Sequence, residues 1–204
     1  MVQEKQKSMS REKILNAIAK NKPAPLPLPE KFSVERPAIN LTERYLEVLQ
    51  SIGGKGRVVS DLTEVEELLQ QKRESGVEVV NCINDLPGYN AGDYVSKLAT
   101  ETQTVQAVFL KGKIAVAENA AIWVPESAAV NRILPFICQE LVMVVDEKKI
   151  VANMHEAYDK IQVDEDGYGA FIAGPSKTAD IEQSLVIGAH GPLQLDVFVV
   201  RSVV

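Results

Sequence analysis

From Asn40 onward, short apolar runs alternate with segments of helical periodicity, and this alternation constrains the fold more than any other feature. The apolar runs that we predict to be strands lie at 55–60, 77–83, 105–111, 114–124, 137–145, 168–173 and 193–200. The segments that we predict to be the main helices lie at 40–52, 61–76, 147–161 and 178–187. Apolar strands that alternate with helices are typical of a parallel sheet covered on both faces.

One part of the sheet is expected to be antiparallel. The apolar segments 105–111 and 114–124 follow each other directly, with Lys111-Gly112-Lys113 between them. Glycine and charged residues at such a place favour a hairpin. The sequence therefore predicts an α/β fold with a mixed, mostly parallel sheet sandwiched by helices.

The first 37 residues differ from the rest of the chain. Ser10 is placed to cap a short amphipathic helix over Arg11–Lys20, and a proline-rich segment, Pro23–Pro29, follows it. Repeated prolines exclude a helix and favour a stiff, extended connector, while a PxxP-type recognition ligand is the sharper alternative. We predict an N-terminal helix and linker over residues 1–37 and one α/β domain over residues 38–204.

The charge balance argues against several classes of partner. The formal net charge is −6, and no basic run is long enough to follow a nucleic acid backbone. The longest apolar runs are of strand size, which is too short for a membrane span. Residues 1–20 are charged throughout and lack the apolar stretch of a signal peptide. We expect no nucleic acid partner, no membrane span and a cytoplasmic location.

Cysteine usage limits the cofactors that this chain can hold. Cys82 and Cys138 are its only cysteines, and both lie in apolar, strand-like surroundings, which favours buried, reduced thiols. No pair of cysteines or histidines has the spacing of zinc ligands. An iron–sulfur cluster usually needs about four thiolates. We therefore expect no metal and no cofactor on this chain by itself.

The segment around residues 174–192 carries the most chemistry. The strand predicted at 168–173 stops at Gly174-Pro175, and Ser176 or Thr178 is placed to cap a helix. Asp180 and Glu182 would then lie in the first helical turn, where carboxylates favour a helix. A well-capped helix is the plain interpretation of this pattern.

A ligand site at the same junction is the functional interpretation. Backbone N–H groups at the start of such a helix can hold an anion or a small molecule, helped here by the Ser176 hydroxyl and the Lys177 ammonium. The carboxylates compete with an anion for the helix dipole, and they could instead orient a hydroxyl or a metal-bound water. The residues that we expect to bind ligand are Gly174, Ser176, Lys177, Thr178, Glu182 and Gly191.

Three side chains are candidates for catalysis. His190 has glycine on one side and Gly188 nearby, which leaves an imidazole that titrates near neutrality relatively open; a turn histidine bonded to a carbonyl is the alternative. Glu118 interrupts the apolar run 114–117 and is either a site carboxylate or a solvent-facing residue at a β-bulge. We predict catalytic roles for His190, Glu118 and Asp180.

The segments Gly174–Glu182 and Gly188–Pro192, followed by an apolar strand at 193–200, resemble the LUD domain of the lactate utilization protein C (LutC/YkgG) family. The resemblance implies a fold similar to the NagB/RpiA/CoA-transferase-like group. It also implies a part in oxidising L-lactate to pyruvate together with separate subunits that carry iron–sulfur clusters. The run Ala117–Ala121 keeps the glutamate of the family's Ala-Glu-Thr-Gly-Thr/Ser-like pattern but not its hydroxyl and glycine positions.

Three functional hypotheses follow. The first is a lactate-utilisation subunit that acts on a small molecule together with iron–sulfur partners, with His190 as the base for an α-hydroxyl proton. The second is a stand-alone enzyme that binds CoA esters or sugar phosphates, with Glu118 as nucleophile. The third is a non-catalytic scaffold that binds a metabolite near His190 and docks a partner through Pro23–Pro29.

Overall fold

The computed structural model describes residues 2–24, 26–27, 39–161, 167–179, 185–188 and 190–201. The chain divides into two compact units, Met1–Pro37 and Ala38–Val204. The first unit contains helix α1 (Val2–Asn21), so the helix begins well before the predicted start at Arg11 and Ser10 lies inside it. None of the helices in the described part of the chain combines the length and the apolar character that crossing a bilayer requires.

The second unit contains all the other elements. Its helices are α2 (Leu41–Ser51), α3 (Thr63–Glu74), α4 (Ala99–Thr102), α5 (Glu126–Ala129), α6 (Leu134–Ile137) and α7 (Met154–Lys160), with 3₁₀ turns η1 (Ala91–Tyr94) and η2 (Glu147–Lys149). Its strands are β1 (Lys55–Val59), β2 (Val79–Asn81), β3 (Ala107–Lys111), β4 (Ile114–Val116), β5 (Ile122–Pro125), β6 (Glu140–Asp146), β7 (Ile150–Val151), β8 (Gly169–Ile172), β9 (Lys177–Ala179), β10 (Leu185–Ile187) and β11 (Gln194–Val200).

Five parallel strands form the main sheet, in the order β1-β11-β6-β3-β2. Successive side chains along a strand point to opposite faces of the sheet. A strand that is apolar at every position can therefore bury side chains on both faces. In β6, Leu141 and Met143 pack on one face, while Val142 and Val144 pack on the other. This arrangement confirms the predicted α/β fold with a mostly parallel sheet.

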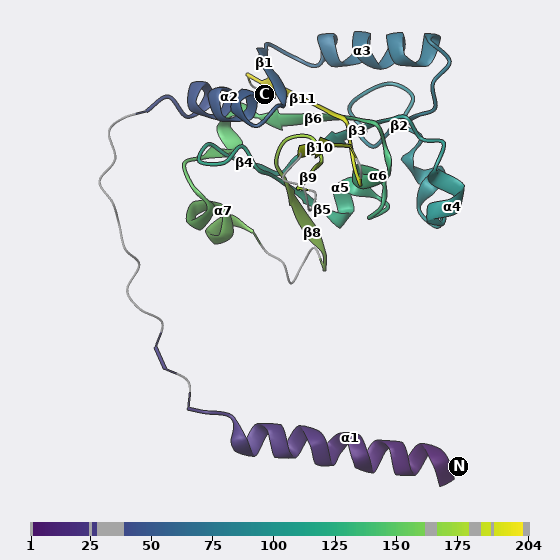
Figure 1. The fold of residues 1–204 in the computed structure, drawn as a ribbon, viewed down its shortest axis with the longest axis vertical. Coiled ribbons are helices and arrows are strands. Elements are labelled where there is room, and N and C mark those ends of the chain that lie inside the picture. The colour runs from purple at the N-terminus through teal and green to yellow at the C-terminus, as the bar shows by residue number, and fades with distance from the viewer. Residues whose placement is uncertain are drawn as a thin grey trace. The chain divides into compact units, whose positions relative to one another are not determined.

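The main sheet lies between two different layers (Figure 1). On one face, Val65 and Leu69 of α3 pack against the core that contains Phe109 and Phe198. On the other face lie α2 and a second sheet of four strands, in the order β7-β4-β5-β8. Helix α7 packs on the outer side of this second sheet, where Ala157 contacts the cluster around Trp123. The sheets and helices thus form stacked layers in which the main sheet is buried on both faces.

Local signals explain the bounds of α2. The side chain of Asn40 accepts hydrogen bonds from the N–H groups of Thr42 and Glu43, as predicted for the N-cap. At the other end, the N–H groups of Gly53 and Gly54 donate to the carbonyls of Gln50 and Leu49, at 3.0 and 2.9 Å. The helix is therefore closed by its own sequence at both ends.

The predicted hairpin at Lys111-Gly112-Lys113 is wrong. β3 belongs to the main sheet, and the chain passes at Gly112 into the second sheet, where β4 begins. The antiparallel pair is β4 with β5, in which Ile114 lies opposite Trp123. A glycine fits at 112 because a Cβ there would lie 2.2 Å from Cγ2 of Ile122. Close packing between two sheets therefore explains this glycine.

The helix predicted over 147–161 is also divided. The chain forms η2, then β7 beside β4 in the second sheet, and only then α7. The side chain of Asp146 accepts from the N–H of Lys148, and the side chain of Asn153 accepts from the N–H of Glu156. These two caps start two separate short elements where the pattern of apolar residues indicated one helix.

Candidate functional site

The C-terminal segment does not form the predicted strand–turn–helix junction. β9 and β10 pair as antiparallel strands, with Thr178 opposite Val186 and Lys177 opposite Ile187. The helix predicted over 178–187 is therefore wrong, and an anion site at its N-terminus is not built. Asp180 and Glu182 lie outside the described residues, and their expected roles stay predictions.

The turn at Gly174-Pro175 folds over the C-terminal end of α2. Gly174 has φ +71°, and a Cβ on it would lie 3.1 Å from the carbonyl oxygen of Ile52. A Cβ built on Gly53 would lie 3.9 Å from the Lys177 ammonium nitrogen. A cation near the exposed carbonyls of a helix end is favourable, and α2 has no basic residue in its own last turn. The Lys177 side chain thus lies near the C-terminal end of α2.

Ser176 and Gly191, two of the residues that we expect to bind ligand, lie close together. The N–H of Ser176 donates to the carbonyl of Pro192 at 2.8 Å, and the N–H of Gly188 donates to the carbonyl of Ser176 at 3.0 Å. A Cβ on Gly191 would lie 3.2 Å from Oγ of Ser176. His190 is exposed in the same loop. This loop leads into β11, so His190 lies at the amino end of the main sheet.

Glu118 lies in a different place. It is exposed in the turn between β4 and β5, and its Oε2 accepts a hydrogen bond from the N–H of Met154 at 3.1 Å. The bond joins this turn to the first residue of α7. Glu118 therefore lies between the second sheet and the start of α7. Ser176, Gly191 and His190 lie elsewhere, at the amino end of the main sheet.

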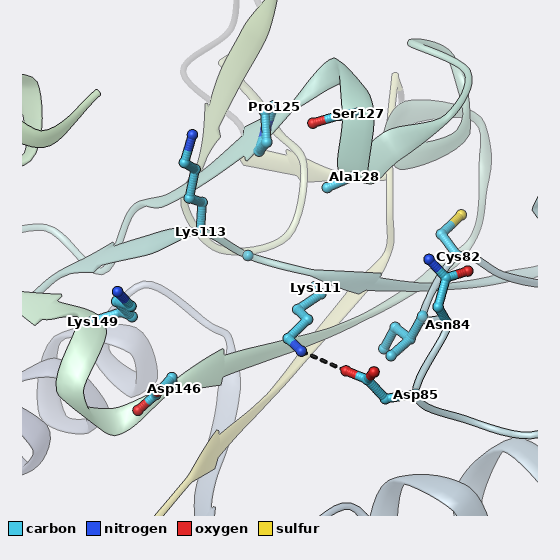
Figure 2. A pocket seen from close by; sticks show the side chains of 12 residues that line it. Cys82, Asn84, Asp85, Lys111, Lys113, Pro125, Ser127, Ala128, Asp146 and Lys149 are labelled. Atoms are coloured by element: carbon cyan, nitrogen blue, oxygen red, sulfur yellow. Dashed lines mark hydrogen bonds and ion pairs between the residues drawn. The ribbon is translucent and has the colours of Figure 1, made fainter. Parts of the chain in front are cut away.

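A pocket of about 540 Å³ opens at the opposite edge of the main sheet, where β2, β3 and β6 end (Figure 2). Its lining residues come from the last residues of β3, β5 and β6, from the segments that follow β2, β3 and β6, and from α5. They are Cys82, Ile83, Asn84, Asp85, Lys111, Gly112, Lys113, Pro125, Ser127, Ala128, Asp146 and Lys149. The carboxyl ends of parallel strands are the usual place for ligands in α/β proteins. We call this hollow the carboxyl-edge pocket.

The pocket lining carries more positively charged than negatively charged side chains. Three lysines and two aspartates line it. The ammonium group of Lys111 pairs with Asp85 at 2.5 Å, and the carboxylate of Asp146 accepts the N–H of Lys148 at 2.8 Å. Lys113 and Lys149 lie on the side away from Cys82 and Asn84 (Figure 2). Such a set can attract an anion, with apolar contacts available from Ile83, Pro125 and Ala128.

This pocket was not predicted from the sequence, although a usable signal was present. Polar residues follow three predicted strands: Asn84-Asp85, Lys111 to Lys113, and Asp146. The carboxyl ends of parallel strands meet at one edge of a sheet, so these groups could have been placed together. The sequence does not reveal that β2, β3 and β6 are neighbours, because this depends on the order of the strands in the sheet.

Both cysteine thiols are buried and difficult to ionise. Both cysteines are free and buried, and burial raises the pKa of each thiol to about 12, so neither forms a thiolate readily. Cys82 follows the carboxyl end of β2, whereas Cys138 precedes the amino end of β6. Within the described ranges, no group of three or more His, Cys, Asp or Glu residues could hold a metal ion.

Proteins of known sequence and structure resemble this chain. Lactate utilization protein C of Bacillus pumilus (strain SAFR-032) is 32% identical over 85 residues, which cover 39% of this chain and 35% of that protein. The protein of the same name from Geobacillus sp. (strain WCH70) is 28% identical over 179 residues, which cover 82% of this chain and 71% of the relative. That of Shouchella clausii (strain KSM-K16) is 34% identical over 86 residues, which cover 40% and 38%. The match therefore spans less than two fifths of the length of the relatives from Bacillus pumilus and Shouchella clausii.

A crystal structure of a DUF162 family protein from Deinococcus radiodurans supports the fold. Its TM-score with this chain is 0.59 at 19% sequence identity, over 80% of this chain and 99% of that one. Residues 92–200 match the family model of the LUD domain. This match includes β3 to β11 and the segments at both edges of the main sheet. The chain therefore belongs to the LUD domain family.

Proposed function

We propose that this protein is a LutC-like component of lactate utilisation that takes part in the oxidation of L-lactate to pyruvate. The observation that carries the proposal is the match of residues 92–200 to the LUD domain. Relatives named lactate utilization protein C agree with it, at 28–34% identity. The domain and these relatives' names support a role in the same process.

In this proposal, iron–sulfur clusters reside on partner proteins. The chain has two cysteines, and both are buried in the core. Oxidation of a 2-hydroxy acid releases electrons that an acceptor must take up. The partners would supply this acceptor, and this chain would contribute to substrate binding or to assembly.

His190 remains the candidate base for the hydroxyl proton. His190 is exposed, and its chain neighbour Gly191 lies against Ser176, which precedes β9. A histidine side chain can accept a proton from a hydroxyl group, as a base for this step must. Asp180 would belong to the same segment. Glu118 contacts α7 instead, so we propose that its contribution is structural.

A genetic experiment tests the proposal. Deletion of the gene should abolish growth of the source organism on L-lactate and leave growth on pyruvate unchanged. The wild-type gene should restore growth, while a gene with His190→Gln should restore it poorly. His155→Gln is a matched control, because His155 is exposed on α7 and far along the chain from this loop. Normal growth of the deletion strain on L-lactate would contradict the proposal.

A biochemical experiment tests the partners. The full-length chain, tagged and purified from cells grown on L-lactate, should bring with it proteins whose absorbance and iron content indicate iron–sulfur clusters. Purified alone, the chain should not oxidise L-lactate with an artificial electron acceptor. Turnover by the chain alone would show that the iron–sulfur partners are unnecessary and would overturn this part of the proposal.

A further inference from the structure

An uncharged surface lies at the amino end of the main sheet. It is formed by three short segments, 103–106, 136–139 and 190–194, which lead into β3, β6 and β11. None of the three contains Asp, Glu, Lys or Arg, although these residues make up 25% of the chain. Glu140, which follows the second segment, is paired with Lys72 of α3. We define the amino-edge surface by five exposed residues of these segments, which are Gln106, Phe136, Gln139, His190 and Leu193.

Backbone contacts join the three segments. The N–H of Gln139 donates to the carbonyl of Gln106 at 3.0 Å, and the N–H of Leu193 donates to the carbonyl of Gln139 at 2.8 Å. A Cβ built on Gly191 would lie 3.9 Å from the carbonyl oxygen of Phe136. Helix α6, which contains Phe136, accordingly lies beside the start of β11 (Figure 1). Segments that are far apart in the sequence therefore form one continuous surface.

Two large apolar side chains of this surface face solvent. Phe136 is 40% exposed and Leu193 is 53% exposed. Exposed apolar groups that lie together commonly mark a site of interaction. The centre of a protein–protein interface is also depleted of charged residues and enriched in aromatic ones. The composition of the amino-edge surface therefore indicates a protein partner.

The position of His190 indicates which partner this is. His190 is exposed on the same surface, where the proposed lactate chemistry makes it the base for the hydroxyl proton. Electrons pass efficiently only over short distances, so their acceptor must come close to the molecule that loses this proton. A protein that covers the surface would also exclude water from a site that is open in the chain by itself. The acceptor and the cover can thus be the same protein.

We propose that the amino-edge surface is the docking surface for the iron–sulfur partner that takes up these electrons. The inference rests on the proposed function and goes beyond it by assigning the partner a place on this chain. The partner buries Phe136 and Leu193, and the side-chain amides of Gln106 and Gln139 provide hydrogen-bond donors and acceptors at the contact. Docking adds no covalent or redox step of its own.

A binding measurement with the isolated partner tests the proposal. The partner is purified together with the full-length chain from cells grown on L-lactate, is identified by its iron content and absorbance, and is then separated and titrated with variants. Leu193→Asp should raise the Kd at least tenfold, because a carboxylate would be buried without a partner. Ile39→Asp is the matched control, since Ile39 is also 53% exposed but precedes α2. Near it, the Thr42 hydroxyl donates to Glu147, which follows the carboxyl end of β6. This control should leave the Kd within about twofold.

A second variant keeps the size of the side chain. Gln139→Glu adds one charge to the amino-edge surface and should raise the Kd about fivefold. Gln71→Glu, at an exposed position of α3, controls for net charge and should leave the Kd within about twofold. Thermal unfolding of each variant shows whether it is folded. If Leu193→Asp unfolds, Gln139→Glu decides the outcome.

Three outcomes overturn the proposal. If the folded variants bind the partner as tightly as the wild type, the docking surface is elsewhere, and the lactate proposal stands. If the purified chain is a dimer that Leu193→Asp converts to a monomer, the surface joins two copies of this chain instead. If the wild-type chain brings no iron–sulfur protein with it, this inference fails together with the proposed partners. Growth of the deletion strain on L-lactate then still reports separately on the role in lactate utilisation.

Discussion

Oε2 of Glu118 accepts a hydrogen bond from the backbone N–H of Met154 at 3.1 Å, and this bond joins the turn after β4 to the start of α7. The first N–H groups of a helix have no partner inside the helix. A carboxylate at this end also interacts favourably with the helix dipole. Glu118 therefore holds α7 against the second sheet.

Replacing Glu118 should change stability more than chemistry. Glu118→Ala should lower the free energy of unfolding by about 0.5–1 kcal/mol, because α7 loses an acceptor for an N–H group. Glu118→Gln keeps an acceptor oxygen and should lose less. Urea denaturation measures both, with Glu67→Ala on the exposed surface of α3 as control. If Glu118→Gln abolished growth on L-lactate at unchanged stability, a catalytic carboxylate would be the better interpretation.

Gly174→Ala should be costly for two reasons. Its φ of +71° is unfavourable for alanine, and the new Cβ would lie 3.1 Å from the carbonyl oxygen of Ile52. Gly76→Ala is the matched control, because Gly76 has φ +80° and open space around the position of a Cβ. We expect a loss of about 1 kcal/mol for Gly76→Ala and about 1 kcal/mol more for Gly174→Ala. Equal losses in thermal unfolding would mean that the contact with Ile52 contributes nothing.

The buried thiols should make stability fall at alkaline pH. Burial raises the pKa of Cys82 and of Cys138 from the ordinary value of 9.0 to about 12. Between these values the unfolded chain releases thiol protons that the folded chain retains, so the unfolded state binds fewer protons and the free energy of unfolding decreases as pH rises. This contribution is fully present below pH 9.0 and is lost as pH rises towards about 12.

Urea denaturation across this pH range checks the sign. A variant with Cys82→Ala and Cys138→Ala should be less stable near neutral pH, because methyl groups fill the thiol sites incompletely. Its stability should nevertheless fall less steeply above pH 9.0 than that of the wild type. Both thiols should also resist iodoacetamide in the folded protein and react after unfolding. Rapid alkylation of the folded chain would contradict the burial of these side chains.

Asp85→Asn should change stability little. The carboxylate of Asp85 pairs with Lys111 at 2.5 Å, and this pair is about half exposed, with relative exposures of 56% and 52%. Exposed pairs contribute about 0–1 kcal/mol, so urea denaturation should show a loss of no more than about 1 kcal/mol. Asp93→Asn, at an exposed aspartate outside the pocket, controls for net charge. A loss of several kcal/mol in Asp85→Asn alone would mean that the pair is far more strongly coupled than its exposure indicates.

Local sequence signals predicted the first half of the domain well. Asn40 and the glycine pair Gly53-Gly54 are caps that act within a few residues, so α2 was found with its ends. The parallel strands of the main sheet were predicted from apolar runs. A strand that is buried on both faces has a continuous apolar sequence, which can be recognised locally. The family resemblance then gave the LUD domain.

The helix predicted over 178–187 was wrong because the residues of this segment favour both a helix and a strand. Ser176 and Thr178 favour a helix start, yet threonine and the pair Val186-Ile187 also favour strands. The segment forms strands because β9 and β10 pair with each other, with Thr178 opposite Val186. No local sequence pattern reveals this pairing. The carboxyl-edge pocket was missed for a related reason, since Asp85, Lys111 and Lys149 meet only through the order of the strands.

The position of β11 has a consequence for biosynthesis. Residues 194–200 lie between β1 and β6, and among the described strands β11 is the neighbour of β1 in the main sheet. β1 therefore lacks this neighbour until β11 has been made. During translation, α2, β1 and α3 leave the ribosome long before their partner has been made. The nascent chain must therefore keep the unpaired edge of β1, with Val58 and Val59, from aggregating until residues 194–200 have been made. Truncation before Gln194, which removes β11, should yield insoluble protein rather than a shortened domain.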